Sequence, residues 1–166
     1  MIHAAILTSS DQGAAGARAD SSGDLLERLL AQAGATIVAR ALLPDDRAVI
    51  AAQIAAWADN GQVNLVVTTG GTGLGLRDVT PEATADVIER QAPGIAEALR
   101  AEGRRSTPLA ALSRGIAGTR GRCLIVNFPG SPRAVEEGFA ALQPLLSHAV
   151  ETMLGPIEQH PTAAAR

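Results

Sequence analysis

Short apolar segments alternate with amphipathic ones along this chain. Leu25, Leu26, Leu29 and Leu30 share one face at helical spacing, and Gly34 follows them, which predicts a helix over 21–33. Further helices are predicted at 47–57, 80–90, 93–101 and 131–153. Strands are predicted at 2–8, 36–43 and 64–68, and a hairpin of 115–119 with 122–127. Thr80 is expected to cap its helix, and Pro144 to kink or divide the last one. Residues 109–112 fit either a helical turn or a strand.

This order of elements predicts an α/β fold. Strands that alternate with helices favour a doubly wound, mainly parallel sheet with helices on both faces, a three-layer α/β/α arrangement, here with a small β-hairpin. Residues 1–156 are expected to form a single domain, and 157–166 a flexible tail. In such sheets ligands bind beyond the carboxyl ends of the strands. The loops at 9–11, 44–46, 70–78 and 127–132 should therefore meet at one edge.

Composition and charge narrow the classes of function. The formal net charge is −3, no residue is lysine, and no basic run is present, which speaks against a nucleic acid or an anionic membrane as partner. No apolar stretch is long enough to cross a membrane and no leader is visible, so a cytoplasmic protein is expected. The single cysteine, Cys123, lies in an apolar run and is interpreted as a buried small residue.

The richest chemistry lies in the loop that follows the third strand. Four glycines fall within residues 70–75, so backbone N–H groups can approach an anion without Cβ clashes. The loop is neither a P-loop, which needs a lysine, nor a dinucleotide fingerprint, whose third glycine would fall on Leu76 or Asp78. A simple turn is the plainer alternative. Asp78 next to bound phosphates would be favourable with Mg2+ between them.

Three of these residues also have ordinary structural explanations. Asp78 could pair with Arg77 or carry a first-turn helix charge. Asp45 could be the N-cap of the helix over 47–57, and taken alone that role is the better explanation. Ser131 could cap the last helix, which is compatible with anion binding at the same helix end.

Longer motifs carry a family resemblance. The run Thr69-Gly70-Gly71-Thr72-Gly73, followed by residues 77–84 (Arg-Asp-Val-Thr-Pro-Glu-Ala-Thr), is highly specific. Shorter matches are Ser10-Asp11 with Gly16, residues 20–23, Pro44-Asp45 and residues 127–132. By these residues the chain, from Ile2 to about Leu154, resembles the molybdenum-cofactor biosynthesis family, the molybdopterin adenylyltransferases. It departs from the family at Leu74 and Leu76, where basic or larger residues are frequent.

The resemblance implies an enzyme, an adenylyltransferase that moves AMP from Mg-ATP to the phosphate of molybdopterin. It makes Asp45 and Asp78 the catalytic and Mg2+-binding carboxylates. It implies cofactor-binding roles for Ser9, Asp11, Ser22, Gly70, Gly71, Thr72, Gly73, Ser113, Asn127, Pro129, Gly130 and Ser131. The partners it implies are molybdopterin, ATP, a downstream metal-insertion protein and two further copies of the chain, as a homotrimer.

The alternative is a protein that binds molybdopterin or a nucleotide and delivers or scaffolds the cofactor without turnover. The presence of both Asp45 and Asp78 favours the enzyme, because a passive module needs no metal-binding pair. If Gly71 lies in an exposed phosphate loop, Gly71→Val should cause a large loss of ATP binding with only a modest loss of stability.

Overall fold

A six-stranded sheet forms the centre of the computed structural model, which describes residues 1–155. The strands are β1 (His3–Ser9), β2 (Thr36–Leu43), β3 (Leu65–Thr69), β4 (Arg90–Gln91), β5 (Ala117–Arg120) and β6 (Cys123–Phe128), in the spatial order β2-β1-β3-β6-β5-β4. The first four of that order run parallel, β5 is antiparallel to β6, and β4 is antiparallel to β5. The predicted doubly wound sheet and its hairpin are confirmed.

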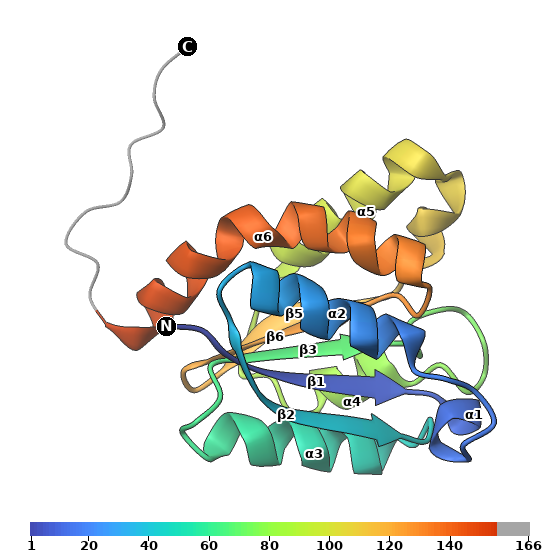
Figure 1. The fold of residues 1–166 in the computed structure, drawn as a ribbon, viewed down its shortest axis with the longest axis horizontal. Coiled ribbons are helices and arrows are strands. Elements are labelled where there is room, and N and C mark those ends of the chain that lie inside the picture. Colours follow the sequence, from blue (N-terminus) through green and yellow to red (C-terminus); the bar gives the residue numbers. More distant parts are fainter. Residues whose placement is uncertain (156–166) are drawn as a thin grey trace.

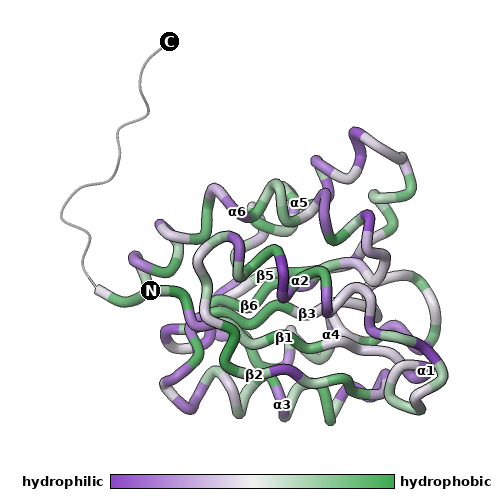
Figure 2. Tube along the Cα trace, viewed as in Figure 1, coloured by the Kyte–Doolittle hydropathy of each residue, from purple (hydrophilic) through white to green (hydrophobic). Residues whose placement is uncertain are grey.

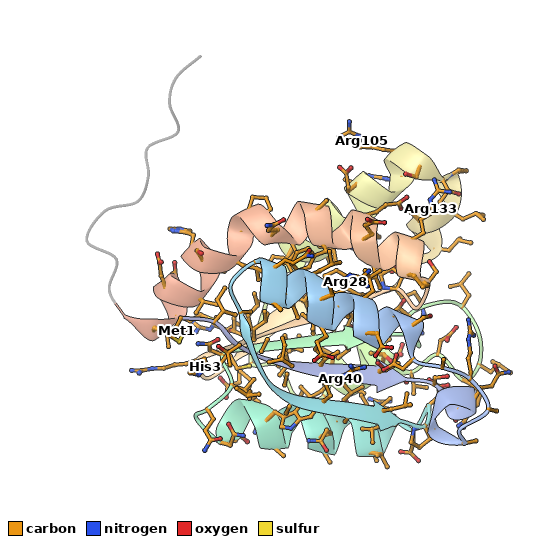
Figure 3. The ribbon with its side chains drawn as sticks, in the orientation of Figure 1. Met1, His3, Arg28, Arg40, Arg105 and Arg133 are labelled. Carbon is orange, nitrogen blue, oxygen red and sulfur yellow. The ribbon has the colours of Figure 1, made fainter. Side chains whose placement is uncertain are left out.

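Helices cover both faces of this sheet (Figure 1). One face carries α2 (Ser21–Gln32), α5 (Pro93–Ser106) and α6 (Pro132–Leu154), and the other carries α3 (Arg47–Asp59) and α4 (Thr80–Ala85). The short helices α1 (Asp11–Ala14) and η1 (Pro108–Leu112) lie in connections. The ion pairs of Arg40 on β2 with Asp24 and Glu27 tie the edge strand to α2 (Figure 3).

The sheet has two cores because successive side chains of a strand point to opposite faces. On β1, Ala4 and Ile6 join the cluster under α2 and α6, while Ala5 and Leu7 join the cluster over α3. Figure 2 shows the central strands as hydrophobic, with hydrophilic residues on the outer sides of the helices. Strands buried on both faces explain the continuous apolar runs of the sequence.

The helix predicted over 80–90 is shorter than expected. It ends at Ala85, and Arg90–Gln91 instead form a strand that pairs with Thr119 and Gly118. A Cβ on Gly118 would lie 2.6 Å from the Arg90 carbonyl oxygen, so glycine permits this approach. The pairing is long-range, which is why local helical periodicity did not reveal it.

The expected cap at Thr80 is wrong. Thr80 lies inside α4, its cap position is Val79, and no side chain caps this helix. The segment between the strand at 2–8 and the helix at 21–33, where no helix was predicted, also contains one, α1, capped by Ser10, whose hydroxyl accepts from the Gly13 N–H.

Pro144 does not divide the last helix. Helix α6 continues from Pro132 to Leu154 with Pro144 inside it. The proline is on an exposed stretch, and Leu142 and Leu146 on either side of it are buried in the core, so packing holds both halves in place. The predicted boundary at 156 and the tail at 157–166 lie outside the described residues. Among residues 1–155, no helix has the length and apolar character needed to cross a bilayer.

Candidate functional site

The four loops that were expected to meet do lie together at the carboxyl edge of the sheet. The Ser10 N–H donates to the Leu43 carbonyl at 2.9 Å, which joins the ends of β1 and β2. The Gly70 N–H donates to the Phe128 carbonyl at 3.3 Å, which joins the ends of β3 and β6. A Cβ on Gly130 would lie 3.2 Å from the Gly70 Cα, so the glycine loop and the loop before α6 are packed against each other.

The glycine loop begins with two left-handed residues. Gly70 and Gly71 have φ of 91° and 62°, a region that residues with a Cβ rarely adopt. A Cβ on Gly71 would overlap the hydroxyl of Thr80, and it would lie 3.2 Å from Ser9 Oγ. Gly71 is therefore closely packed over polar groups of the site. The expectation that Gly71→Val costs little stability is wrong, because the position is crowded and not open.

Two cavities open at this edge. The first, about 510 Å3, has a largely apolar wall from α5, η1 and α6 that includes Leu99, Leu109 and Leu112, with Ser113 beside them. The second, about 370 Å3, is lined by polar groups at the end of β1, at the start of α2 and in the loop after β2, among them Ser9, Ser22 and Asp45. Both cavities are lined by Gly71, Asp78, Gly130 and Ser131. These shared residues form the boundary at which molecules in the two cavities would meet.

Asp45 belongs to the polar cavity and is not a helix cap. Its Oδ1 accepts from Ser9 Oγ at 2.5 Å and its Oδ2 accepts from the Asp11 N–H at 3.0 Å. The N-cap of α3 is the neighbouring Asp46, whose side chain accepts from the Val49 N–H. The chain thus uses one aspartate for the helix and points the other toward the loop after β1.

Neither structural explanation considered for Asp78, an ion pair with Arg77 or a charge in the first turn of a helix, applies. Arg77 makes a bidentate ion pair with Asp11, with both contacts at 2.9 Å, and does not pair with Asp78. Helix α4 starts two residues later, at Thr80. The Asp78 carboxylate accepts from the Gly75 N–H at 2.8 Å, which turns it back over its own loop at the boundary of the two cavities.

Asp11 positions its neighbours and does not itself line either cavity. Its carboxylate accepts from the Asp45 N–H at 3.0 Å while it binds Arg77. The hydrogen bonds from Arg77 hold the pKa of Asp11 below its usual value, so this carboxylate stays charged at neutral pH. The result is a rigid link between the loop after β1, the loop after β2 and the glycine loop.

The remaining predicted residues divide into two groups. Those that line a cavity are Ser9, Ser22, Gly70, Gly71, Thr72, Gly73, Ser113, Pro129, Gly130 and Ser131. Ser131 caps α6 as well, because its hydroxyl accepts from the Ala134 N–H at 3.2 Å. Asn127 lines neither cavity. Its amide donates to the hydroxyls of Thr68 and Thr84, and its oxygen accepts from the Ile116 N–H, so it joins buried strands and α4.

Sequence reasoning missed three arginines. Arg18 lines the polar cavity, and Arg100 on α5 lines the apolar one while it donates to the Gly115 carbonyl at 2.7 Å. Arg114 donates hydrogen bonds to the Gly73 and Asp78 carbonyls of the glycine loop. Arg18 could have been found by the same topological argument as Asp11, since it lies in the loop after β1. Nothing local in the sequence marks Arg100 or Arg114.

The described residues hold no group of three or more histidine, cysteine, aspartate or glutamate side chains arranged for a metal ion. Asp45 and Asp78 both line the polar cavity, however, and their hard oxygen atoms suit Mg2+. Magnesium is commonly held by one or two carboxylates together with the phosphates of a substrate. The donor set fits that arrangement.

Comparison with known proteins agrees with this geometry. A family model described as "Probable molybdopterin binding domain" matches residues 5–148. A molybdopterin adenylyltransferase of Helicobacter pylori is 36% identical over 156 residues, which cover 93% of this chain and 89% of that protein. The crystal structure of the molybdopterin biosynthesis enzyme MoaB from Thermus thermophilus superposes with a TM-score of 0.88 at 44% identity, over 94% of this chain and 98% of that one.

An open α/β sheet with two adjoining cavities at its carboxyl edge defines a small-ligand-binding protein of the doubly wound class. The chain belongs to the molybdopterin-binding family of molybdenum-cofactor biosynthesis proteins, so the resemblance seen in the sequence is confirmed. Its domain also occurs in longer proteins: it matches 24% of the Drosophila melanogaster protein "Molybdenum cofactor synthesis protein cinnamon", at 40% identity.

Proposed function

We propose that this protein is a molybdopterin adenylyltransferase, which transfers AMP from ATP to the terminal phosphate of molybdopterin. Relatives with this name in Helicobacter pylori and Escherichia coli are 36% and 37% identical to it. One structural observation supports the reaction most directly. The two cavities share Gly71, Asp78, Gly130 and Ser131, as a transfer between two bound substrates requires.

The chemistry of the walls suggests which substrate each cavity takes. The apolar wall of the larger cavity suits the flat pterin ring system, with Ser113 and Arg100 available as polar contacts. The smaller cavity offers hydroxyls, Arg18 and the glycine loop, which suit the phosphates of the nucleotide. The reacting phosphates would then meet at the shared boundary.

The transfer is an in-line displacement at phosphorus. An oxygen of the molybdopterin phosphate forms a bond to the α-phosphorus of ATP, the bond from that phosphorus to the bridging oxygen breaks, and pyrophosphate leaves with the electron pair. Such a reaction needs positioning and charge stabilisation more than a strong base. Backbone N–H groups of residues 71–73 and the electropositive start of the 23-residue helix α6 supply both at the boundary.

Mg2+, when bound, would neutralise charge on the reacting phosphates. In this proposal Asp45 and Asp78 hold the ion. The hydrogen bonds from Ser9 and the Asp11 N–H orient the Asp45 carboxylate, and the bond from the Gly75 N–H orients that of Asp78. Each carboxylate oxygen keeps a lone pair for a cation or for water bound to it.

The cellular setting is part of the same proposal. The protein works in the cytoplasm as a homotrimer and passes adenylylated molybdopterin to a metal-insertion protein. Light scattering at micromolar concentration tests the assembly. A measured mass close to the 16.9 kDa of one chain would contradict the trimer.

Turnover by the purified protein tests the activity. Protein, molybdopterin and ATP should yield pyrophosphate and adenylylated molybdopterin in equal amounts when Mg2+ is present, and neither product when the ion is chelated. Tight binding of both substrates without either product would favour the alternative, a carrier or scaffold. Asp78→Asn should lose about two orders of magnitude or more in kcat, as expected when one centre of electrostatic stabilisation is removed.

A further inference from the structure

Arg114 connects both ends of the glycine loop. Its backbone N–H donates to the Thr72 carbonyl at 2.8 Å and its Nε donates to the Gly73 carbonyl at 2.6 Å, just before the exposed residues 74–77 of the loop. Its Nη2 donates to the Asp78 carbonyl at 2.7 Å, where the loop ends. The residues between these anchors are open to solvent, and Leu76 is fully exposed. Side-chain packing therefore contributes little there, and the position of Asp78 depends on hydrogen bonds: those of the adjacent Arg77 to Asp11, and that of Arg114 to the Asp78 carbonyl.

Glu82 holds the Arg114 guanidinium in place. Its carboxylate, on the first turn of α4, is hydrogen-bonded to Nη1 and Nη2 of Arg114. The hydrogen bonds from Arg114 lower the pKa of Glu82, so the pair stays ionised at neutral pH. The planar guanidinium can point separate N–H groups at three acceptors at once, which a lysine ammonium on a flexible chain cannot reproduce.

Arg114 does not line either cavity, although its neighbour Ser113 lines the apolar one. Arg100 fixes the backbone on both sides of Arg114 by donating to the carbonyls of Ser113 and Gly115. The short segment 113–115 thus touches the apolar cavity with one residue and holds the loop of Asp78 with the next.

We propose that Arg114 is a positioning residue for adenylyl transfer: by joining the Thr72–Gly73 and Asp78 carbonyls, it places the Asp78 carboxylate at the boundary between the two cavities. The inference rests on the proposed function for its effect on catalysis. Its structural part, the order of the loop, stands on the hydrogen bonds alone.

The chain contains a matched control. Arg120 on β5 makes a bidentate ion pair with Asp59, with both contacts at 2.8 Å, and donates to the Val87 carbonyl at 3.1 Å. Its side chain is 28% exposed, against 34% for Arg114. It lines neither cavity. Arg114→Lys and Arg120→Lys therefore remove similar interactions, one at the loop and one away from it.

The first experiment compares steady-state kinetics with ATP and molybdopterin. Arg114→Lys should lower kcat by about 10- to 100-fold, because displacements near 1 Å at a reacting group have effects of that size. The KM values should change by less than about threefold, since Arg114 lines neither cavity. Arg120→Lys should keep both constants. Equal kcat for the two variants would overturn the proposal, whereas an inactive wild type would instead overturn the proposed function.

The second experiment needs no activity. The Asp78 N–H donates to the Gly75 carbonyl at 3.0 Å, so amide hydrogen exchange of residues 74–78 reports on the order of this loop. Exchange at Asp78 should become about tenfold faster in Arg114→Lys and stay unchanged in Arg120→Lys. Unchanged exchange in both would overturn the proposal. If Arg114→Lys does not fold, Glu82→Gln with Asp59→Asn as its control tests the same pair from the other side.

Discussion

Replacing Gly71 by alanine tests how closely the glycine loop is packed over the site. Gly71 has φ of 62°, so any residue with a Cβ is strained there. The new methyl group would also overlap the Thr80 hydroxyl and lie 3.3 Å from Asp45 Oδ1. Gly61 is the matched control, because its φ is 72° and a Cβ there would meet nothing within 4 Å.

The two positions separate the backbone effect from the packing effect. A left-handed residue with a Cβ costs about 1–2 kcal/mol, which is the whole loss expected for Gly61→Ala. Overpacking adds about 1–3 kcal/mol at Gly71, so Gly71→Ala should lose about 2–5 kcal/mol. The free energy of unfolding of such domains is about 5–15 kcal/mol, so from the middle of that range both variants should still fold.

Urea unfolding of the wild type and both variants measures these losses. The free energy of unfolding of Gly71→Ala should fall by at least about 1 kcal/mol more than that of Gly61→Ala. Equal losses would refute the reasoning, because they would show that Gly71 serves the turn alone and is not crowded by Thr80, Ser9 and Asp45.

Two further predictions concern ionisable groups. Arg77 and Arg114 hold the pKa values of Asp11 and Glu82 below their ordinary values of 3.8 and 4.5. These pairs therefore contribute their full stability above the ordinary pKa values, and that contribution is lost as the pH falls through the lowered pKa values of the folded protein. Urea unfolding should therefore show a fall in stability from neutral pH to about pH 3 that is smaller in Asp11→Asn, and an equal fall would contradict the pairing. Burial raises the pKa of the Cys123 thiol to about 12, so an aromatic disulfide reagent should react with it only after unfolding. Reaction of the native protein at the same rate would contradict that burial.

The sequence predicts the fold well where the signal is local. Residues 36–43 form the predicted strand with the same bounds, because this short, mostly apolar run begins with the β-branched residues Thr36, Ile37 and Val38 and stops before Pro44. The convergence of the four loops also follows from the pattern, since parallel strands end at one edge. The failures come from long-range contacts. Arg90–Gln91 became a strand because β5 offers a partner, and α6 passes through Pro144 because buried leucines hold it on both sides.

The candidate site shows the same division. The rule that loops after parallel strands meet at one edge placed Asp45 and Asp78 together, but taken alone Asp45 was better explained as the cap of α3, and the cap is Asp46. Arg114 was not predictable, because its partner Glu82 is 32 positions away and a single arginine among apolar and small residues has no distinguishing pattern. Asn127 was predicted from its motif to bind a ligand. Its buried side-chain amide donates hydrogen bonds to the hydroxyls of Thr68 and Thr84. Its binding role stays a prediction.

Transfer of a labelled AMP group tests the central claim most directly. ATP carrying a labelled α-phosphate is mixed with molybdopterin, Mg2+ and the wild type, Asp78→Asn or Asp86→Asn. Asp86 is the control because it lines neither cavity and pairs with Arg47 on the surface. The account predicts label in adenylylated molybdopterin for the wild type and Asp86→Asn, and almost none for Asp78→Asn. Equal labelling by all three proteins, or none by the wild type, would contradict it.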